Sequence, residues 1–573
     1  MKSNILIFII AVGVMFVTSC SEVKFGDEFL GDSPERLGAT LDTMFSSAVH
    51  SDKVLTTAYL NLPYGTKRSY TTDIYTDLAI KTGANPYYNG AIDPTVSKND
   101  LLYAAGGESD WKAIRYAWLY IEHIDKVKDM DNSEKARRVA EAKTIIALCY
   151  GRMLRNVGGV PLIKKSIGLD DAFTFPRTSF AETVDYIVTL LDEAVEDLPW
   201  KSTANDDGRM TKAGAMGLKL RVLLFAASPT FNSTTPWHAK ANKYTRYVDG
   251  DVMGKWRRAV SAGEAFMSAL QENGEYMLTQ PTEETHEARR LAFRKAYYER
   301  GGTEILISTR RSFNKPVFEG GMRYYFGPTL NYIDMFPWAD GTEFPDDYDW
   351  SSSTQSPFYD KDHRPTRDPR LYETAAVPGS YHYNGTIAPV YLGHPDYRKG
   401  SSTGFRTMKF ILESYEDRAG KGTQFPYLRL PEVFLSYAEA LNEVEGGPNE
   451  KAYDFINRVR NRVGLSDLPK GLSQESFRKA LLKERALEFG FENVRWYDLI
   501  RRGMASDFTK DLNILISTVT KKENNVPVSF RFEAIKWNPN RYWKEHWDTK
   551  WYLSPIPRLE LNKGYGWIQN PGW

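Results

Sequence analysis

The sequence predicts a mainly α-helical protein, in which a spine of stacked helix pairs carries an irregular, loop-rich subdomain. Two observations lead to this fold class. Several segments repeat apolar residues at spacings of three and four, which is the period of an amphipathic helix. Between them lie two long stretches, residues 57–110 and 300–428, that are rich in Gly, Pro, Asn, Asp, Tyr and Trp. Their aromatic content argues against disorder, so we expect structured excursions that pack on the spine and build a surface.

The first element along the chain is a leader. An apolar run of 13 residues extends from Ile5 to Val17. A bilayer takes about 20 apolar residues, so this run suits the core of a secretory signal peptide instead. It ends in the letters VTSC, which resemble the lipobox of bacterial lipoproteins. We expect residues 1–19 to be a signal peptide and Cys20 to carry a lipid at the new N-terminus. An ordinary secretory signal with an incidental cysteine is the alternative.

Five amphipathic helices are expected in the N-terminal half. Ser179 is followed three residues later by Glu182, a capping-box pattern that predicts a helix start. Ser133 is placed to cap an earlier helix. Small residues in the fourth segment permit close approach of a neighbouring helix. The expected helical segments are 110–127, 133–154, 179–199, 211–229 and 254–274.

A second group of helices is expected towards the C-terminus. Residues 429–447 and 448–465 each carry an apolar stripe along one helix face. Paired amphipathic helices of this kind look like tetratricopeptide-type repeats, although the pairs are unevenly spaced. Such pairs stack into a superhelical spine.

Charge and motif content exclude several classes of function. The 74 basic and 73 acidic side chains give a net charge of +1, and no run of like charge stands out, so nucleic-acid binding has little electrostatic support. The eight histidines show no zinc-ligand spacing, and phosphate-loop and nucleophile-elbow motifs are absent. Cys149 lies in an apolar helical stretch, where we expect it to be buried. No cofactor is expected. The acidic stretch PDDYDW could bind a structural calcium ion, but a solvated turn is the favoured interpretation.

Three glutamates invite a catalytic interpretation. Glu484, Glu488 and Glu492 repeat every four residues, which would place them along one helix face. A glycosidase needs two carboxylates at comparable separations. Nearby Arg485, Arg495 and Arg501 would lower the carboxylate pKa values, which is the wrong direction for a general acid. We therefore expect structural ion pairs and no catalytic residues.

Five stretches of the chain, taken together, resemble one family. They are the lipobox at Cys20, RDPRLYET, RLPEVFLSYAEALNE followed by AYDFINRVRNRVGL, KERALEFGFENVRWYDLIRRG, and the terminal WYLSPIPRLELNKGYGWIQNPGW. In this order they are similar to the SusD/RagB family, outer-membrane lipoproteins of Bacteroidetes that capture nutrients. The resemblance implies a tetratricopeptide-like spine, an irregular ligand-binding subdomain, and a role as a lid on a SusC-like, TonB-dependent transporter.

The expected domain organisation follows from the helices and the resemblance together. Residues 20–56 form the anchor, tether and first helix, and 57–299 form an N-terminal region of helix pairs. Residues 300–573 form the C-terminal region, with irregular loops over 300–428, helices over 429–503 and a tail over 504–573.

Two aromatic loops are the expected ligand-binding surface. A sugar ring packs its apolar face on a flat Trp or Tyr ring, while amide and carboxylate groups bond its hydroxyls. The alternative is that these rings pack inward against the spine. For the tail, with six tryptophans in its last 37 residues, packing is favoured over ligand contact. The expected contacts are Tyr87, Tyr88 and Asn89 in the first loop, and Trp338, Asp340, Tyr348 and Trp350 in the second.

Together with these observations, the resemblance implies a non-catalytic, lipid-anchored and surface-exposed protein of the outer membrane. We expect it to capture oligosaccharides or polysaccharides and to deliver them to a SusC-like transporter. Peptide capture is a second hypothesis, in which Arg68, Arg310 and Arg311 would bind peptide carboxylates. An (α/α) toroid glycoside hydrolase or lyase is a third, which the irregular stretch 300–428 and the tail motif oppose.

Overall fold

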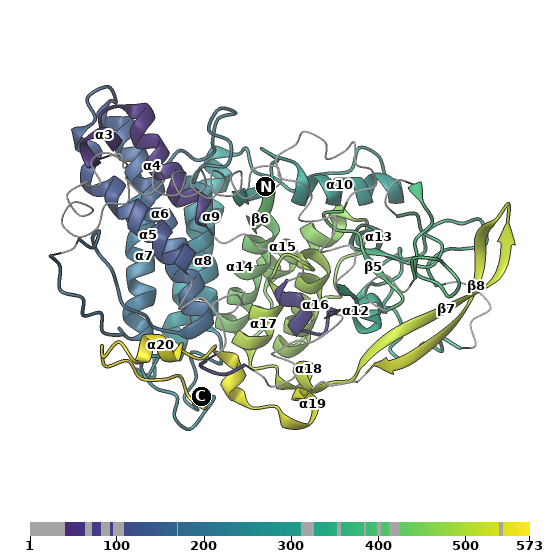
Figure 1. Ribbon diagram of the computed structural model, residues 1–573. Coiled ribbons are helices and arrows are strands. Elements are labelled where there is room, and N and C mark those ends of the chain that lie inside the picture. Colours follow the sequence, from purple (N-terminus) through teal and green to yellow (C-terminus); the bar gives the residue numbers. More distant parts are fainter. Residues whose placement is uncertain are drawn as a thin grey trace, which may run out of the picture.

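The computed structural model shows a helical body at one end of the molecule and an irregular subdomain at the other (Figure 1). It describes residues 40–62, 71–81, 92–95, 108–168, 170–310, 326–351, 357–382, 385–397, 403–411, 424–537 and 542–573. Cys20 lies outside the described residues, as do Arg68, Arg311 and the expected contacts Tyr87, Tyr88 and Asn89.

The N-terminal helices form a continuous stack. From α4 to α9 each α-helix packs on the next one along the chain, and α9 then packs on α14. The mainly α-helical fold with a helical spine is therefore confirmed. The helices are α3 (Leu41–Met44), α4 (Ala48–Leu60), α5 (Glu108–His123), α6 (Asn132–Val157), α7 (Phe180–Asp197), α8 (Lys212–Ala227) and α9 (Val252–Asn273).

The two expected helix caps differ in outcome. At α7, the Glu182 amide donates to the Ser179 hydroxyl at 3.1 Å and the Ser179 amide donates to the Glu182 carboxylate at 2.8 Å, so the capping box is confirmed. At α6, the prediction that Ser133 is the N-cap is wrong. Asp131 is the cap and accepts from the Glu134 amide at 2.8 Å, because its carboxylate already stands one turn before that amide.

The C-terminal helices continue the stack towards the centre of the molecule. At the crossing of α9 and α14, Gly263 faces the ring of Tyr437, and a Cβ atom added to Gly263 would lie 2.3 Å from it. A small residue therefore permits the close approach of the two helices. The helices are α14 (Leu430–Glu445), α15 (Glu450–Arg462), α16 (Gln474–Phe489), α17 (Arg495–Arg502) and α18 (Ala505–Thr509).

The irregular subdomain is built from short elements that pair over long sequence distances. Three small antiparallel sheets join β1 to β3, β2 to β6 and β4 to β5. Its elements, with β1 from the first excursion, are β1 (Ala79–Lys81), α10 (His286–Tyr298), β2 (Ile305–Arg310), β3 (Phe326–Pro328), α12 (Leu330–Met335), α13 (Pro369–Thr374), β4 (Ala375–Ala376), β5 (Arg406–Thr407) and β6 (Gln424–Arg429).

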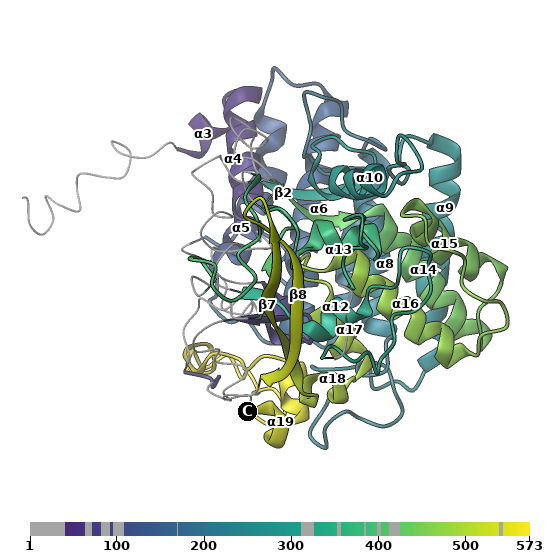
Figure 2. The same ribbon diagram turned by 90° about the vertical axis from the view of Figure 1, so that its right-hand side faces the viewer.

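The tail contains a long β-hairpin that the sequence analysis does not anticipate. Strands β7 (Leu512–Glu523) and β8 (Val526–Trp537) pair antiparallel around Asn524 and Asn525, whose φ angles of 48° and 65° suit a tight hairpin turn. The hairpin lies at the right-hand edge in Figure 1, and Figure 2 shows it running down the face that is turned towards the viewer. The remaining short helices are η2 (Thr72–Tyr75), η4 (Ile124–Lys126), α19 (Trp543–His546), η6 (Thr549–Tyr552) and α20 (Arg558–Leu561).

Most of the buried apolar side chains form one large cluster. Trp543 and Trp551 belong to it, which confirms packing for these two tail tryptophans. Cys149 is buried as expected, and burial raises the pKa of its thiol well above the ordinary value. No helix in the described ranges combines the length and the apolar character that a membrane crossing requires.

Candidate functional site

An arc of aromatic rings lies on the segment that follows α12. The ring centroids of Trp338 and Phe344 are 5.1 Å apart, those of Phe344 and Tyr348 are 4.8 Å apart, and those of Tyr348 and Trp350 are 5.0 Å apart. The structure therefore brings the three expected aromatic contacts of this loop together. Phe344, which the sequence analysis did not single out, is buried in the middle of the arc.

The three expected rings differ in exposure. Trp338 and Tyr348 are half-buried and pack against the main hydrophobic cluster. Trp350 is only 6% exposed, because Phe358 and Phe532 pack against it at centroid distances of 5.8 and 5.9 Å. A ring enclosed in this way offers almost no face to a ligand, so Trp350 supports the arc from beneath.

A buried arginine fixes the arc from the protein side. The Arg367 guanidinium lies 3.5 Å from the Phe344 ring centroid and 5.3 Å from that of Trp338. It is fully buried and donates to the backbone carbonyls of Ile333 and Phe336. Burial raises the pKa of the nearby Asp334 carboxyl to about 7, although the charge of Arg367 acts in the opposite direction. These contacts hold the rings in place before any ligand arrives.

Two exposed carboxylates lie on the same segment as the arc. Asp340 is exposed and accepts from the Thr342 amide at 2.9 Å, a bond that lowers its pKa. Asp347 is exposed as well. Within the described ranges, no three His, Cys, Asp or Glu side chains gather as metal ligands. The arc can thus offer ring faces and hydrogen-bond acceptors to a polyhydroxylated molecule.

The three glutamates form structural ion pairs, but with partners other than those expected. Glu492 lies beyond the end of α16, so the three do not share one helix face. The expected partners Arg485, Arg495 and Arg501 instead pair with Asp498, Asp77 and Glu439. The observed pairs are Glu484 with Arg370 and Arg460, Glu488 with Arg370, Arg429 and Arg462, and Glu492 with Lys409 and Arg429.

The charge state of Glu488 follows from this network. Its burial alone would raise the carboxyl pKa, but Arg462, Arg429 and Arg370 hold it well below the ordinary range. A general acid needs the opposite shift. Glu488 is fully buried, which also keeps it away from any substrate.

Arg310 does not stand ready for a peptide carboxylate. It pairs with Asp207 at 2.8 Å and donates to the Asp207 carbonyl at 2.6 Å. Among the arginines expected for peptide capture, it is the one that lies in the described ranges.

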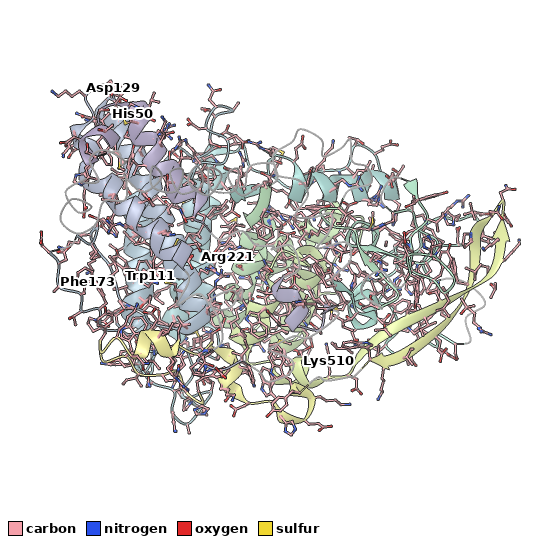
Figure 3. The ribbon with its side chains drawn as sticks, in the orientation of Figure 1. His50, Trp111, Asp129, Phe173, Arg221 and Lys510 are labelled. Carbon is pink, nitrogen blue, oxygen red and sulfur yellow. The ribbon has the colours of Figure 1, made fainter. Side chains whose placement is uncertain are left out.

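A separate pocket of about 650 Å³ is lined in part by Glu560 of α20, which lies at the lower left in Figure 1, whereas α12, which precedes the arc, lies right of centre. Trp111 at the start of α5, Phe173 and Phe175 on the segment after α6, and Tyr565 and Trp567 in the tail line it. Figure 3 shows Trp111 and Phe173 on this side. No local motif announces this pocket, because its walls come from segments that are distant in the sequence.

Comparison with known proteins gives a consistent picture. The SusD family model matches residues 291–573. A SusD-like protein of Bacteroides ovatus is 24% identical over 528 residues, which are 87% of this chain and 82% of that protein. The crystal structure of a SusD-like protein from Bacteroides fragilis has a TM-score of 0.73 at 22% identity and covers 93% of this chain and 98% of its own. A SusD-like carbohydrate-binding protein, also from Bacteroides fragilis, has a TM-score of 0.65 at 20% identity, covering 91% of this chain and 99% of its own.

These solved structures share their fold with this chain along nine-tenths of its length. The family model accounts for the part that contains the aromatic arc, the buried glutamates and the tail. Residues 291–573, just under half of the chain, belong to the SusD family, and the chain as a whole shares the fold of SusD-like proteins.

Proposed function

We propose that the chain is a non-catalytic glycan-binding protein that captures oligosaccharides at the cell surface and delivers them to a SusC-like transporter of the outer membrane. Membership of the SusD family supports this role, and one structural neighbour is titled a carbohydrate-binding protein. The lipobox at Cys20 supports attachment to the membrane by lipid.

The arc provides the proposed ligand site, and the observation that carries the proposal is its half-buried pair of rings. Trp338 and Tyr348 are half-buried, and both rings pack on Phe344, which in turn lies against the Arg367 guanidinium. A sugar can stack its C–H face on these rings and direct its hydroxyls to Asp340. A fixed arrangement loses little freedom on binding, which favours affinity.

The absence of catalysis is part of the same proposal. Glu484, Glu488 and Glu492 are buried in ion pairs and cannot reach a glycosidic bond at the arc. Incubation of the protein with a bound glycan should leave the glycan at its original length, and shortened products would contradict the proposal.

The test of the site is removal of both half-buried rings. The double variant Trp338→Ala, Tyr348→Ala should lose its retardation in affinity electrophoresis on the polysaccharide that retards the native chain. Tyr542→Ala, which removes a ring that is 45% exposed in the tail, is the control and should keep it. Unchanged retardation of the double variant would exclude the arc as the glycan site.

We also propose that the loop with Tyr87, Tyr88 and Asn89 contacts the glycan, on the basis of its sequence alone. The variant Tyr87→Ala, Tyr88→Ala should weaken retardation on the same polysaccharide.

The anchor and the delivery role have their own measurements. Cys20→Ala should move the protein out of the membrane fraction, because no lipid can then be attached. The native chain should co-purify with a TonB-dependent transporter from solubilised outer membranes. Retention of Cys20→Ala in membranes would contradict the lipid anchor without touching the glycan proposal.

A further inference from the structure

The pocket near α20 has the size and the walls of a ligand site. Its volume of about 650 Å³ lies within the range of small-molecule sites, about 300–1,000 Å³. None of the residues that line it belongs to the arc around Trp338. Five aromatic side chains face it, together with Ile114, Pro161, Ile163 and Ile167. It is therefore a second aromatic surface, separate from the proposed site.

Long-range hydrogen bonds hold its walls in position. The Trp567 indole donates to the Phe175 carbonyl at 2.5 Å, and the Phe175 and Tyr565 rings meet edge to face at 5.6 Å. Behind them, Arg177 donates to the Ile568 carbonyl at 2.7 Å and to the Asn570 side chain at 3.0 Å. The tail is thus attached to the segment after α6, and the pocket exists without a ligand.

Exposed apolar side chains occur in the lining of the pocket and next to lining residues in the sequence. Phe173 is 53% exposed, and in the adjoining tail Leu559 and Ile568 are 67% and 55% exposed. Exposed apolar side chains that gather in one place mark binding sites, whereas single ones are ordinary. Phe173 lines the pocket and is more than half exposed, so a flat apolar ligand surface can pack on its ring.

The charged side chains that line the pocket indicate the charge of the ligand that it can bind. Three basic side chains line the pocket, Arg115, Lys165 and Lys563, against one acidic side chain, Glu560. Lys563 pairs with Glu560 at 2.7 Å, and Lys165 pairs with Asp171, which lies outside the lining.

Arg115 differs from the two lysines. Its hydrogen bond goes to the Ile167 carbonyl, and within the described ranges no carboxylate lies at ion-pair distance from it. Among the described residues, therefore, none neutralises its positive charge, and a planar guanidinium matches carboxylate and sulfate groups well. The pocket thus combines aromatic side chains with an arginine that has no ion-pair partner in the described part of the chain.

We propose that this pocket binds an acidic sugar, a uronate or a sulfated residue of an oligosaccharide. The sugar ring packs its C–H face against Phe173, and its anionic group pairs with Arg115. This inference rests on the proposed function, because it assigns a second, charge-selective site to a glycan-binding protein.

Isothermal titration of the full chain in detergent tests the inference with three probes: an oligogalacturonate, a sulfated galacto-oligosaccharide and a neutral oligosaccharide of the same length. Arg115→Gln should weaken binding of an acidic probe about tenfold, the value of one charge-assisted hydrogen bond. Phe173→Ala should weaken it about fivefold through the lost ring contact. Added salt should weaken binding to the native chain more than to Arg115→Gln. The two acidic probes show whether the anion is a carboxylate or a sulfate.

Matched controls separate the pocket from the general surface. Arg257→Gln removes the charge of another exposed helical arginine, and Met277→Ala removes another exposed apolar side chain. Both should leave the affinity unchanged.

The outcomes distinguish this inference from the proposed function. If Arg115→Gln binds the acidic probes as tightly as the native chain, or if an apolar peptide fills the pocket independently of Arg115, the inference fails. If the neutral probe alone binds, and binding depends on Trp338 and Tyr348, the inference fails while the proposed function stands. Binding of none of the three probes counts against both.

Discussion

Helices α8 and α16 are both deeply buried, but their surroundings are held together in different ways. The buried face of α8 consists of small and apolar side chains, with Arg221 as its one charged member. Helix α8 packs mainly on α7 and α9, its immediate neighbours in the chain. Helix α16 buries Glu484, Arg485 and Glu488. The glutamates bind arginines from α13, α15 and the end of β6, up to 118 residues away.

The difference indicates how each part obtains its arrangement. Neighbouring helices align through contacts that are local in sequence, and apolar packing suffices. Short segments from distant parts of the chain have little apolar surface of their own. Paired charges give them directional bonds that fix their positions, at a cost in desolvation that the pairing must offset.

The largest expected effect is on the charged side of this comparison. Glu488→Gln leaves Arg370, Arg429 and Arg462 without the carboxylate that they share, and uncompensated buried charge is costly. The free energy of unfolding should fall by about 3–5 kcal/mol in chemical denaturation. The matched control is Glu450→Gln, which breaks an exposed pair with Lys470 and should cost less than about 1 kcal/mol. Equal losses of unfolding free energy in the two variants would show that the buried ion pairs stabilise the fold no more than an exposed pair does.

Asp73 is buried and pairs with no arginine of the described ranges, so it should make stability depend on pH. Burial raises the pKa of Asp73 to about 7, from 3.8, although hydrogen bonds from Thr71 and from the Phe491 and Asn493 backbone act against it. Between about pH 4 and 7 the folded protein holds a proton here that the unfolded chain releases, so stability falls as pH rises. Asp73→Asn should flatten this decline by up to about 4 kcal/mol across the window. Denaturation curves at several pH values measure it, and identical slopes would contradict the assignment.

The stability of the apolar helix contacts should depend on side-chain volume and not on charge. In Gly263→Ala the new methyl group meets the Tyr437 ring and forces α9 away from α14. Overpacking of this kind costs about 1–3 kcal/mol. Gly447→Ala, where no atom lies within 4 Å of the added Cβ, should change stability by less than about 0.5 kcal/mol. Unchanged stability of Gly263→Ala would show that α9 and α14 can move apart without loss of free energy.

The smallest effect concerns a single helix start. Ser179→Ala removes the capping box of α7 and should lower stability by about 1 kcal/mol. Ser133→Ala leaves the true cap of α6, Asp131, in place and should have almost no effect. Thermal unfolding of the two variants side by side compares them, and the reverse order would be evidence against the observed caps.

The spine could be predicted from the sequence because its signals are local. Apolar spacing and the cap at Ser179 lie within a few residues of the structure they specify. The expected partners of the glutamates fail for the opposite reason. Proximity in sequence favours Arg485, whereas Glu484 and Glu488 both reach Arg370 on a different helix. Nothing in the spacing of the three glutamates indicates those contacts.

The expected site illustrates the same limit. Trp338, Tyr348 and Trp350 gather in one arc as their spacing suggests, but exposure depends on what covers them. Phe532 on β8 covers Trp350. The alternation of apolar and charged residues before Trp537 and the paired asparagines at the turn are signals that could have revealed this hairpin. Without β8, the depth of Trp350 could not be inferred.

The attachment of the tail to the segment after α6 has a consequence for the order of folding. The hydrogen bond from Arg177 to Ile568 closes a loop of 391 residues. Closure over such a separation is slow compared with the pairing of adjacent helices, since the entropy of the intervening chain must be lost first. We expect the bundle of α5 to α9 to assemble early, and the wall formed by Tyr565 and Trp567 to arrive among the last steps of maturation.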